Sequence, residues 1–109
     1  MADSQELPVR HRDLQEITQF WKNFGYYDVP YDQLLWIIGE HLKYGTIEVI
    51  EVNDDIIGFA RWNINGNVAT ILDCVIKPDY RHKNIVKLII LRAWRRFPEV
   101  QIMKFERGV

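Results

Sequence analysis

Apolar residues three or four positions apart recur through the first half of the chain. This spacing predicts an amphipathic helix that begins at Asp13, its expected N-cap, and ends at Gly25. A second helix is predicted between Asp32, also an expected N-cap, and Gly45. The apolar sides of the two helices carry Leu14, Ile17, Phe20, Trp21 and Phe24, and Leu34, Leu35, Ile38, His41 and Leu42. A short edge strand over residues 7–10 is expected to precede them.

Alternating apolar and polar residues take over after the second helix. The alternation and the tight turns between the runs predict three antiparallel strands, over residues 46–52, 56–64 and 68–76. Pro78 ends the third strand, and a helix over 83–97 and a strand over 100–105 follow. Because a helix between two strands lets them pair in parallel, strand 68–76, the helix and strand 100–105 are expected to form a parallel β-α-β unit. The fold class is therefore α/β, of the α+β type, with a mixed central sheet.

Length and composition limit the class of protein. With 109 residues the chain is expected to form a single domain over residues 1–109. Cys74 is the only cysteine, so no intramolecular disulfide can form and a reducing, cytoplasmic location is expected. No apolar run approaches the ~20 residues of a membrane span, and the three histidines lack metal-binding spacing. We therefore expect neither a membrane segment nor a metal site, with Cys74 and all four tryptophans (Trp21, Trp36, Trp62 and Trp94) in the core.

Charge is divided unevenly along the chain. Residues 1–73 carry 5 Lys and Arg against 12 Asp and Glu, a net of −7, whereas residues 74–109 carry 9 against 3, a net of +6. A basic segment of this kind favours an anionic ligand, either a phosphorylated cofactor or nucleic acid. Aromatic residues do not alternate with basic ones in a stacking pattern, which disfavours single-stranded nucleic acid. The alternative is that Arg92, Arg95 and Arg96 form a solvated helix face that complements the negative helix C-terminus.

Three basic residues, Lys77, Arg81 and Lys83, lie where a strand passes through a turn into a helix. Residues 75–86 read Val-Ile-Lys-Pro-Asp-Tyr-Arg-His-Lys-Asn-Ile-Val. In a strand–turn–helix of this kind, free backbone N–H groups and the positive end of the helix face an anion. The segment is therefore the predicted anion-binding site.

Several segments also carry a known family pattern. Segment 51–60 has the pattern of the family's β-hairpin, and segment 71–91 has the pattern of the strand, turn and helix that follow the hairpin. The positions in the second segment that match the family pattern are Ile76, Pro78, Tyr80, Arg81, Lys83 and Ile85. On these residues the chain resembles the GCN5-related N-acetyltransferase (GNAT) superfamily through most of its length. The resemblance implies a GNAT-like fold and acyl transfer from acetyl-CoA to an amine.

The resemblance also implies roles for individual residues. The pyrophosphate of acetyl-CoA would bind the N–H groups of the turn, and its pantetheine would lie along the strand that ends at Val75 and Ile76. The expected cofactor-binding residues are Val75, Ile76, Arg81, His82, Lys83, Asn84, Ile85 and Val86. Amine acetylation needs a base that accepts the ammonium proton, and Asp73 is the only acidic residue of that strand. Asp73 is thus the expected catalytic base; the alternative is a structural carboxylate bonded to a neighbouring group.

Two departures from the family pattern support a second interpretation. Asn84 and Val86 stand where the family keeps glycine or another small residue, which lets the backbone approach the diphosphate. The fold is also expected to be truncated after strand 100–105, and no residue matches the family's C-terminal tyrosine. The alternative function is therefore a catalytically inactive, possibly phage-type GNAT-fold module with a structural or interaction role. In either case the open edge of strand 100–105 is expected to pair with a protein partner or a second copy of the chain.

Overall fold

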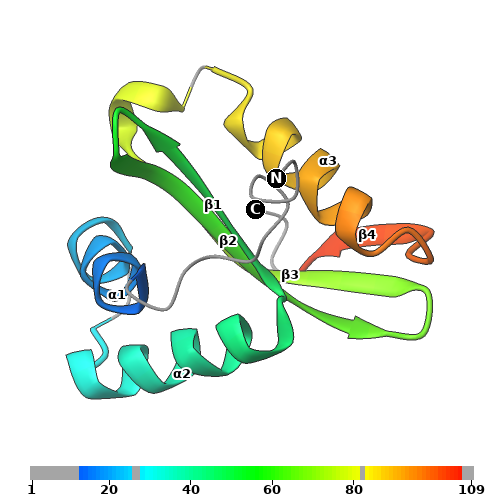
Figure 1. Cartoon of the computed structure of the whole chain (residues 1–109), viewed down its shortest axis with the longest axis horizontal. Helices are drawn as coiled ribbons and strands as arrows, with labels where there is room; N and C mark the ends of the chain where they lie inside the picture. The colour runs from blue at the N-terminus through cyan, green and yellow to red at the C-terminus, as the bar shows by residue number, and fades with distance from the viewer. Residues whose placement is uncertain (1–12, 26–27, 82, 107–109) are drawn as a thin grey trace, which may run out of the picture.

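The computed structural model describes residues 13–25, 28–81 and 83–106, and its helices and strands follow the predicted order (Figure 1). The strand expected over residues 7–10 lies outside the described residues. The elements are α1 (Asp13–Phe24), α2 (Tyr31–Tyr44), β1 (Ile47–Val52), β2 (Asp55–Asn65), β3 (Val68–Ile76), the short 3₁₀ helix η2 (Pro78–Tyr80), α3 (Ile85–Arg96) and β4 (Ile102–Phe105).

The sheet is mixed, as predicted, with the strand order β1-β2-β3-β4. β1, β2 and β3 form an antiparallel meander, whereas β4 pairs with β3 in parallel after the crossover through α3. The fold class and the parallel β-α-β unit are therefore confirmed.

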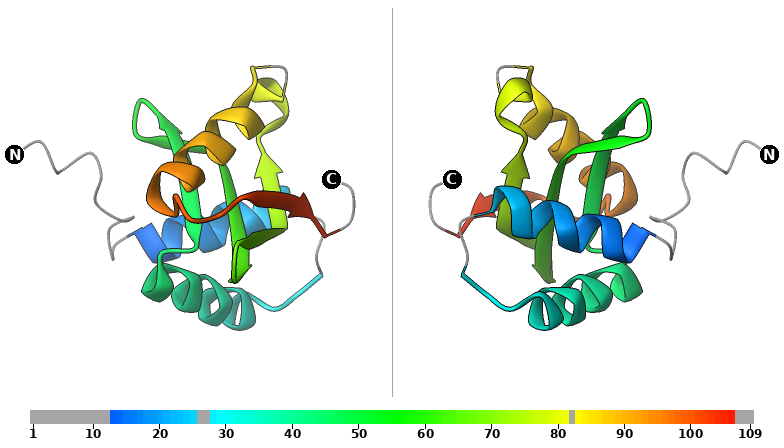
Figure 2. Two further views of the ribbon diagram at one scale, coloured as in Figure 1. Left: turned by 90° about the vertical axis from the view of Figure 1, so that its right-hand side faces the viewer. Right: turned by 90° about the vertical axis from the view of Figure 1, so that its left-hand side faces the viewer.

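Helices cover both faces of the sheet: α1 and α2 pack on one face and α3 on the other (Figure 2). Successive strand residues point to opposite faces, so neighbours in the sequence belong to different cores. Phe59 and Val75 pack with α1 and α2, whereas Ala60 and Ile76 pack with Ile85 of α3. The sheet thus separates two hydrophobic clusters, and each helix layer is fixed by one of them.

Several predicted boundaries are wrong by one or two residues. Asp32 does not cap the second helix: α2 begins at Tyr31 with Pro30 at the N-cap, which places Asp32 in the first turn. There its charge still complements the positive helix end. The last helix begins at Ile85 instead of residue 83, because Asn84 adopts a left-handed conformation (φ 57°, ψ 32°) that interrupts helical geometry. β4 begins at Ile102 and is shorter than the predicted strand over 100–105.

The expectation that all four tryptophans lie in the core is half wrong. Trp21 and Trp62 are buried, as predicted. Trp36 is 69% exposed, and Trp94 is partly exposed with its indole N–H donating to the Val100 carbonyl at 2.6 Å. Residues 34–38 of α2 are all apolar, so helical periodicity alone does not show which of them face the sheet.

Candidate functional site

β3 keeps an open edge where β4 leaves it. The parallel pairing covers only Val68–Ile71 of β3, and the Glu106 N–H donates to the Ile71 carbonyl at its end. β3 continues to Ile76, so within the described residues its second half has no strand on that side. The opening begins at a β-bulge, where Leu72 is an extra residue between the pairs Arg61↔Asp73 and Trp62↔Ile71.

Strand register decides which backbone groups face the open edge. The Lys77 N–H donates to the Ile57 carbonyl of β2 at 2.8 Å, so Val75, two residues earlier, also directs its backbone groups to β2. The backbone groups of Cys74 and Ile76 then point away from β2, towards the opening. Of the two strand residues expected to bind the cofactor, Ile76 thus offers its backbone to the open edge, whereas Val75 contributes a buried side chain beneath it.

The turn after β3 folds back onto the end of the strand. Arg81 Nε donates to the Ile76 carbonyl at 3.0 Å, and the backbone N–H groups of Arg81 and Lys83 donate to the Pro78 and Tyr80 carbonyls. Arg81 and Lys83 are both exposed. The basic side chains therefore surround the end of the open edge, while His82 lies outside the described residues.

The N-terminus of α3 faces this turn without a side-chain cap. Asn84 occupies the N-cap position in the left-handed region and makes no capping bond. The N–H groups of the first helical turn have no partner within a helix and carry its positive end. Asparagine tolerates this backbone conformation better than most residues, so Asn84 makes the turn for which the family uses glycine.

A hollow of about 570 Å³ opens beside this helix end, and we refer to it as the α3 hollow. Its lining residues are Arg81, Asn84, Ile85, Val86, Lys87, Ile90, Leu91 and Trp94. It brings together four of the eight expected cofactor residues, Arg81, Asn84, Ile85 and Val86, together with a further cation, Lys87, that the motif did not single out. Val86 is 38% exposed, so its side chain lies at the surface of the hollow. Basic side chains and helix N–H groups can bind phosphate here.

The arginines at the other end of α3 have a different role. Arg92 Nη1 lies 3.4 Å and Arg96 Nη2 lies 2.9 Å from carboxylate oxygens of Glu48 on β1. These pairs connect α3 to β1. This part of the basic segment is thus neither a free anion site nor a fully solvated face.

On the other face of the sheet, a chain of polar side chains runs from β3 to α2. Arg61 Nε donates to Asp73 Oδ2 at 2.7 Å, and Arg61 Nη2 lies 2.6 Å from the same oxygen. Arg61 Nη1 lies 3.1 Å from His41 Nε2, and the guanidinium stacks over the Trp21 ring at 5.1 Å. His41 Nδ1 in turn lies 2.7 Å from Thr46 Oγ1. The arrangement ties α2 to the centre of the sheet.

The protonation state of His41 follows from these contacts. Arg61 can only donate, so His41 Nε2 must accept, and the ring proton belongs on Nδ1, which faces the hydroxyl and carbonyl oxygens of Thr46. Burial, with the positive charge of Arg61, lowers the pKa of His41 below its usual 6.5. His41 is therefore neutral at physiological pH.

Asp73, the expected base, is only 5% exposed. Its bond to Arg61 matches the structural alternative considered with that role. The role of Asp73 as a base remains a prediction. Cys74 is partly buried, and burial, with the nearby Asp73 carboxylate, raises the pKa of its thiol to about 11. Cys74 is thus an un-ionised thiol rather than a nucleophile.

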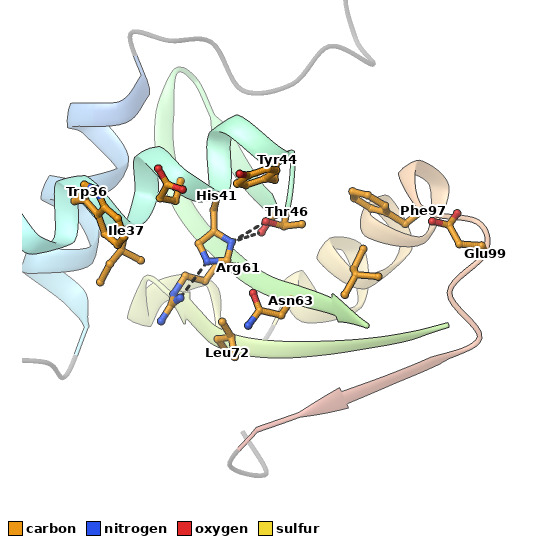
Figure 3. Close-up of a pocket in the computed structure, with 12 residues that line it drawn as sticks. Trp36, Ile37, His41, Tyr44, Thr46, Arg61, Asn63, Leu72, Phe97 and Glu99 are labelled. Carbon is orange, nitrogen blue, oxygen red and sulfur yellow. Dashed lines mark hydrogen bonds between the residues drawn. The ribbon is translucent and has the colours of Figure 1, made fainter. Parts of the chain in front are cut away.

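A second and larger cavity, about 670 Å³, lies above this polar chain, and we refer to it as the α2 pocket (Figure 3). Its lining residues are Trp36, Ile37, Glu40, His41, Tyr44, Thr46, Arg61, Asn63, Ile64, Leu72, Phe97 and Glu99. Leu72, the bulge residue at which β3 and β4 separate, belongs to this lining. The α2 pocket therefore adjoins the opening in the sheet, and its volume suits a small organic molecule.

Sequence reasoning missed most of the α2 pocket. Trp36, Glu40 and Tyr44 recur at four-residue spacing, which places them on one side of a helix and is the sequence signal for this wall of the pocket. Arg61, the only charged residue of the strand predicted over 56–64, is a second signal. Among the described residues there is no group of side chains that could hold a metal ion, and no helix in those segments is long and apolar enough to cross a membrane.

Comparison with solved structures shows the same fold in acetyltransferases. The aminoglycoside N-acetyltransferase AAC(6')-Iy in complex with CoA superposes with a TM-score of 0.73 and 18% identity, over 90% of this chain and 72% of that one. AAC(6')-IG from Acinetobacter haemolyticus gives 0.71 and 12%, over 92% and 77% of the two chains. Diaminobutyrate acetyltransferase from Paenibacillus lautus, in complex with L-2,4-diaminobutyric acid and coenzyme A, gives 0.64 and 15%, over 81% and 54%.

Sequence comparison gives the family independently of the structure. Curated proteins yield no match. The family model described as "Acetyltransferase (GNAT) family" matches residues 11–106, which is nearly the whole chain and includes every element of the described fold. The chain therefore belongs to the GNAT family of acetyltransferases.

Proposed function

We propose that this protein is an N-acetyltransferase that transfers the acetyl group of acetyl-CoA to an amine. The observation that carries the proposal is the open edge of β3, which runs from the α3 hollow to Leu72 at the α2 pocket. A thioester laid along this edge has its phosphates at α3 and its acetyl group at the pocket. The CoA complexes among the similar structures support the choice of donor.

In this proposal the phosphates of CoA bind the N–H groups at Asn84, Ile85 and Val86, with charge from Arg81, His82 and Lys83 around them. The pantetheine amides bond to the backbone of Cys74 and Ile76, beside Val75. The Ile76 carbonyl already accepts from Arg81, so Ile76 offers mainly its N–H.

The reaction joins the acceptor nitrogen to the thioester carbonyl carbon and breaks the carbon–sulfur bond. The amine loses one proton, and the departing thiolate gains one, so that the products are an amide and CoA. Asp73 is the proposed base on sequence grounds, and its burial under Arg61 means that any proton transfer to it requires the pair to open.

Calorimetric titration with acetyl-CoA and CoA tests the donor site. We expect the parent protein to bind both ligands, and Arg81→Gln and Lys87→Gln to bind them more weakly. Lys104→Gln is the control, because Lys104 is exposed on β4, and it should leave binding unaltered. Val86→Gly and Val86→Ala should both strengthen binding if the β-branched side chain obstructs the phosphates. Absence of heat and of any thermal shift at millimolar ligand would exclude the enzyme and favour the inactive GNAT-fold module.

We further propose that the open edge of β4 pairs with a second copy of this chain. β4 is an edge strand of the described sheet, and Ile102 on it is 51% exposed. Sedimentation at high concentration is expected to give a dimer, with slow amide exchange in β4. A monomer whose β4 amides exchange freely would contradict this.

The proposed location is the cytoplasm, because acetyl-CoA is present there and Cys74 stays reduced there.

A further inference from the structure

Three side chains of α2 occupy positions that packing does not explain. Trp36, Glu40 and Tyr44, here called the α2 stripe, recur every fourth residue and all line the α2 pocket. Trp36 is 69% and Tyr44 is 64% exposed, although large aromatic side chains are mostly buried in folded proteins. Neither belongs to either hydrophobic cluster of the described core. Two exposed rings with a carboxylate between them therefore stand at a pocket rather than in a core.

The opposite wall of the pocket repeats this chemistry. Phe97 and Glu99, which follow α3, lie across the pocket from Trp36 and Ile37 in Figure 3. Carboxylates and aromatic rings thus line both walls. Rings attract cations to their faces, and carboxylates attract them by charge.

The positive groups near the pocket do not cancel this character. Arg61 at the base of the pocket pairs with Asp73 at 2.6 Å, and His41, which it also contacts, is neutral. Lys43 Nζ lies 5.5 Å from the centroid of the Tyr44 ring, and Lys43 is not among the residues that line the pocket. Among the described residues no salt bridge reaches Glu40 or Glu99. Two carboxylates therefore remain available to a ligand.

The chemistry of acetyl transfer limits which nitrogen these carboxylates can hold. The reacting nitrogen must be neutral when it attacks the thioester, so its charge cannot keep the acceptor in place through the reaction. A second nitrogen that stays protonated can. We propose that the α2 pocket selects a small dicationic amine, with one ammonium group held by the α2 stripe and the other nitrogen directed to the opening at Leu72.

The proposal rests on the proposed function for its reacting end, but binding of the cation can be measured without acetyl-CoA. The probes are three five-carbon molecules: 1,5-diaminopentane, 1-aminopentane and pentanoate. Titration at low salt, followed by calorimetry and by the indole N–H signals in NMR spectra, is expected to give about tenfold tighter binding for the diamine than for the monoamine. Pentanoate is expected not to bind, and added salt should weaken binding of the diamine, because it screens the charges.

Variants separate charge from shape. Glu40→Gln is expected to lower the affinity for the diamine about tenfold, to that for the monoamine. Trp36→Leu is expected to lower it about fivefold, because the ring face that attracts the cation is lost. Trp36→Phe should retain most of the affinity. Glu51→Gln, an exposed carboxylate on β1 outside the pocket, serves as the matched control and should change nothing. Circular dichroism verifies that each variant is folded.

Several outcomes would overturn the inference: equal affinity for diamine and monoamine, no binding of either, or equal losses in Glu40→Gln and Glu51→Gln. Titration of the same variants with CoA keeps the two proposals apart. If CoA fails to bind while the diamine binds as expected, the acetyltransferase is refuted and the cation site stands. If CoA binds and the diamine does not, the cation site is refuted alone.

Discussion

Replacing Asp73 with asparagine is expected to lower the free energy of unfolding by about 3 kcal/mol, because it leaves the Arg61 charge unpaired beneath α2. Two guanidinium nitrogens lie 2.6 and 2.7 Å from Asp73 Oδ2, and the side chains of Arg61 and Asp73 are 17% and 4% exposed. Removing one partner of a buried ion pair costs roughly 3–5 kcal/mol. The partial exposure of Arg61 and its contacts with His41 and Trp21 place the expected loss at the lower end.

Urea unfolding of four proteins measures this loss: the parent, Asp73→Asn, Arg61→Gln and the double variant. The double-mutant cycle is expected to give a coupling energy of about 2 kcal/mol, since each single variant strands the other partner. Arg92→Gln is the matched control, because Arg92 is 45% exposed and lies 3.4 Å from Glu48. A surface pair of this kind contributes no more than about 1 kcal/mol. If Asp73→Asn costs no more than Arg92→Gln, or if the coupling is near zero, the reasoning is refuted.

The same variant distinguishes the two interpretations of Asp73, once acetyl transfer to an amine can be measured. A base is expected to contribute about 10²–10⁴-fold to kcat. If Asp73 only positions Arg61, kcat of Asp73→Asn should fall far less than this when it is measured at a temperature at which the variant is still folded. The free energy of unfolding should still fall by about 3 kcal/mol.

Three further predictions concern single residues. Because burial and Arg61 lower the pKa of His41 below 6.5, the unfolded chain takes up a proton first as pH falls. Stability should thus be full above pH 6.5 and decline below it, and urea titrations at several pH values should show a smaller decline in His41→Gln. Cys74, with a thiol pKa of about 11, should react with iodoacetamide at pH 8 about 100-fold more slowly than in the denatured chain, and equal rates would contradict its burial. In urea unfolding, Gly45→Ala should lower the free energy of unfolding by about 1 kcal/mol because φ is 72° there, whereas Gly39→Ala, within α2 and with its nearest neighbour 4.0 Å away, should raise it slightly.

The order of elements could be predicted because each one has a local signal. Alternation identified β1 to β3, and prolines and glycines gave most of the ends. The proposed phosphate-binding end of the site could also be predicted, since the turn, the basic residues and the helix start are contiguous in the sequence. Even the left-handed Asn84 agrees with the known tolerance of asparagine for that conformation.

The α2 pocket, the proposed acceptor site, could not be predicted in the same way. His41, Arg61 and Asp73 meet only because α2 docks on β2 and because β2 and β3 pair in one particular register. The docking face of α2 has no local signal, because apolar residues occur on every side of this helix. The register of β2 and β3 has none either, because the bulge that sets it depends on pairing between the two strands. The prediction that Trp36 lies in the core is wrong for this reason, and its exposure marks the pocket instead.

The bulge at Leu72 changes the phase of β3. Before it, Ala69 and Ile71 point to the α3 side; after it, Asp73 and Val75 point to the α1 and α2 side, although all four are odd-numbered. Without the extra residue, strict alternation would turn Asp73 into the apolar layer under α3, away from Arg61. A single inserted residue thus divides β3 into two parts: the first half pairs with β4, whereas the second half keeps an open edge and turns Asp73 towards Arg61.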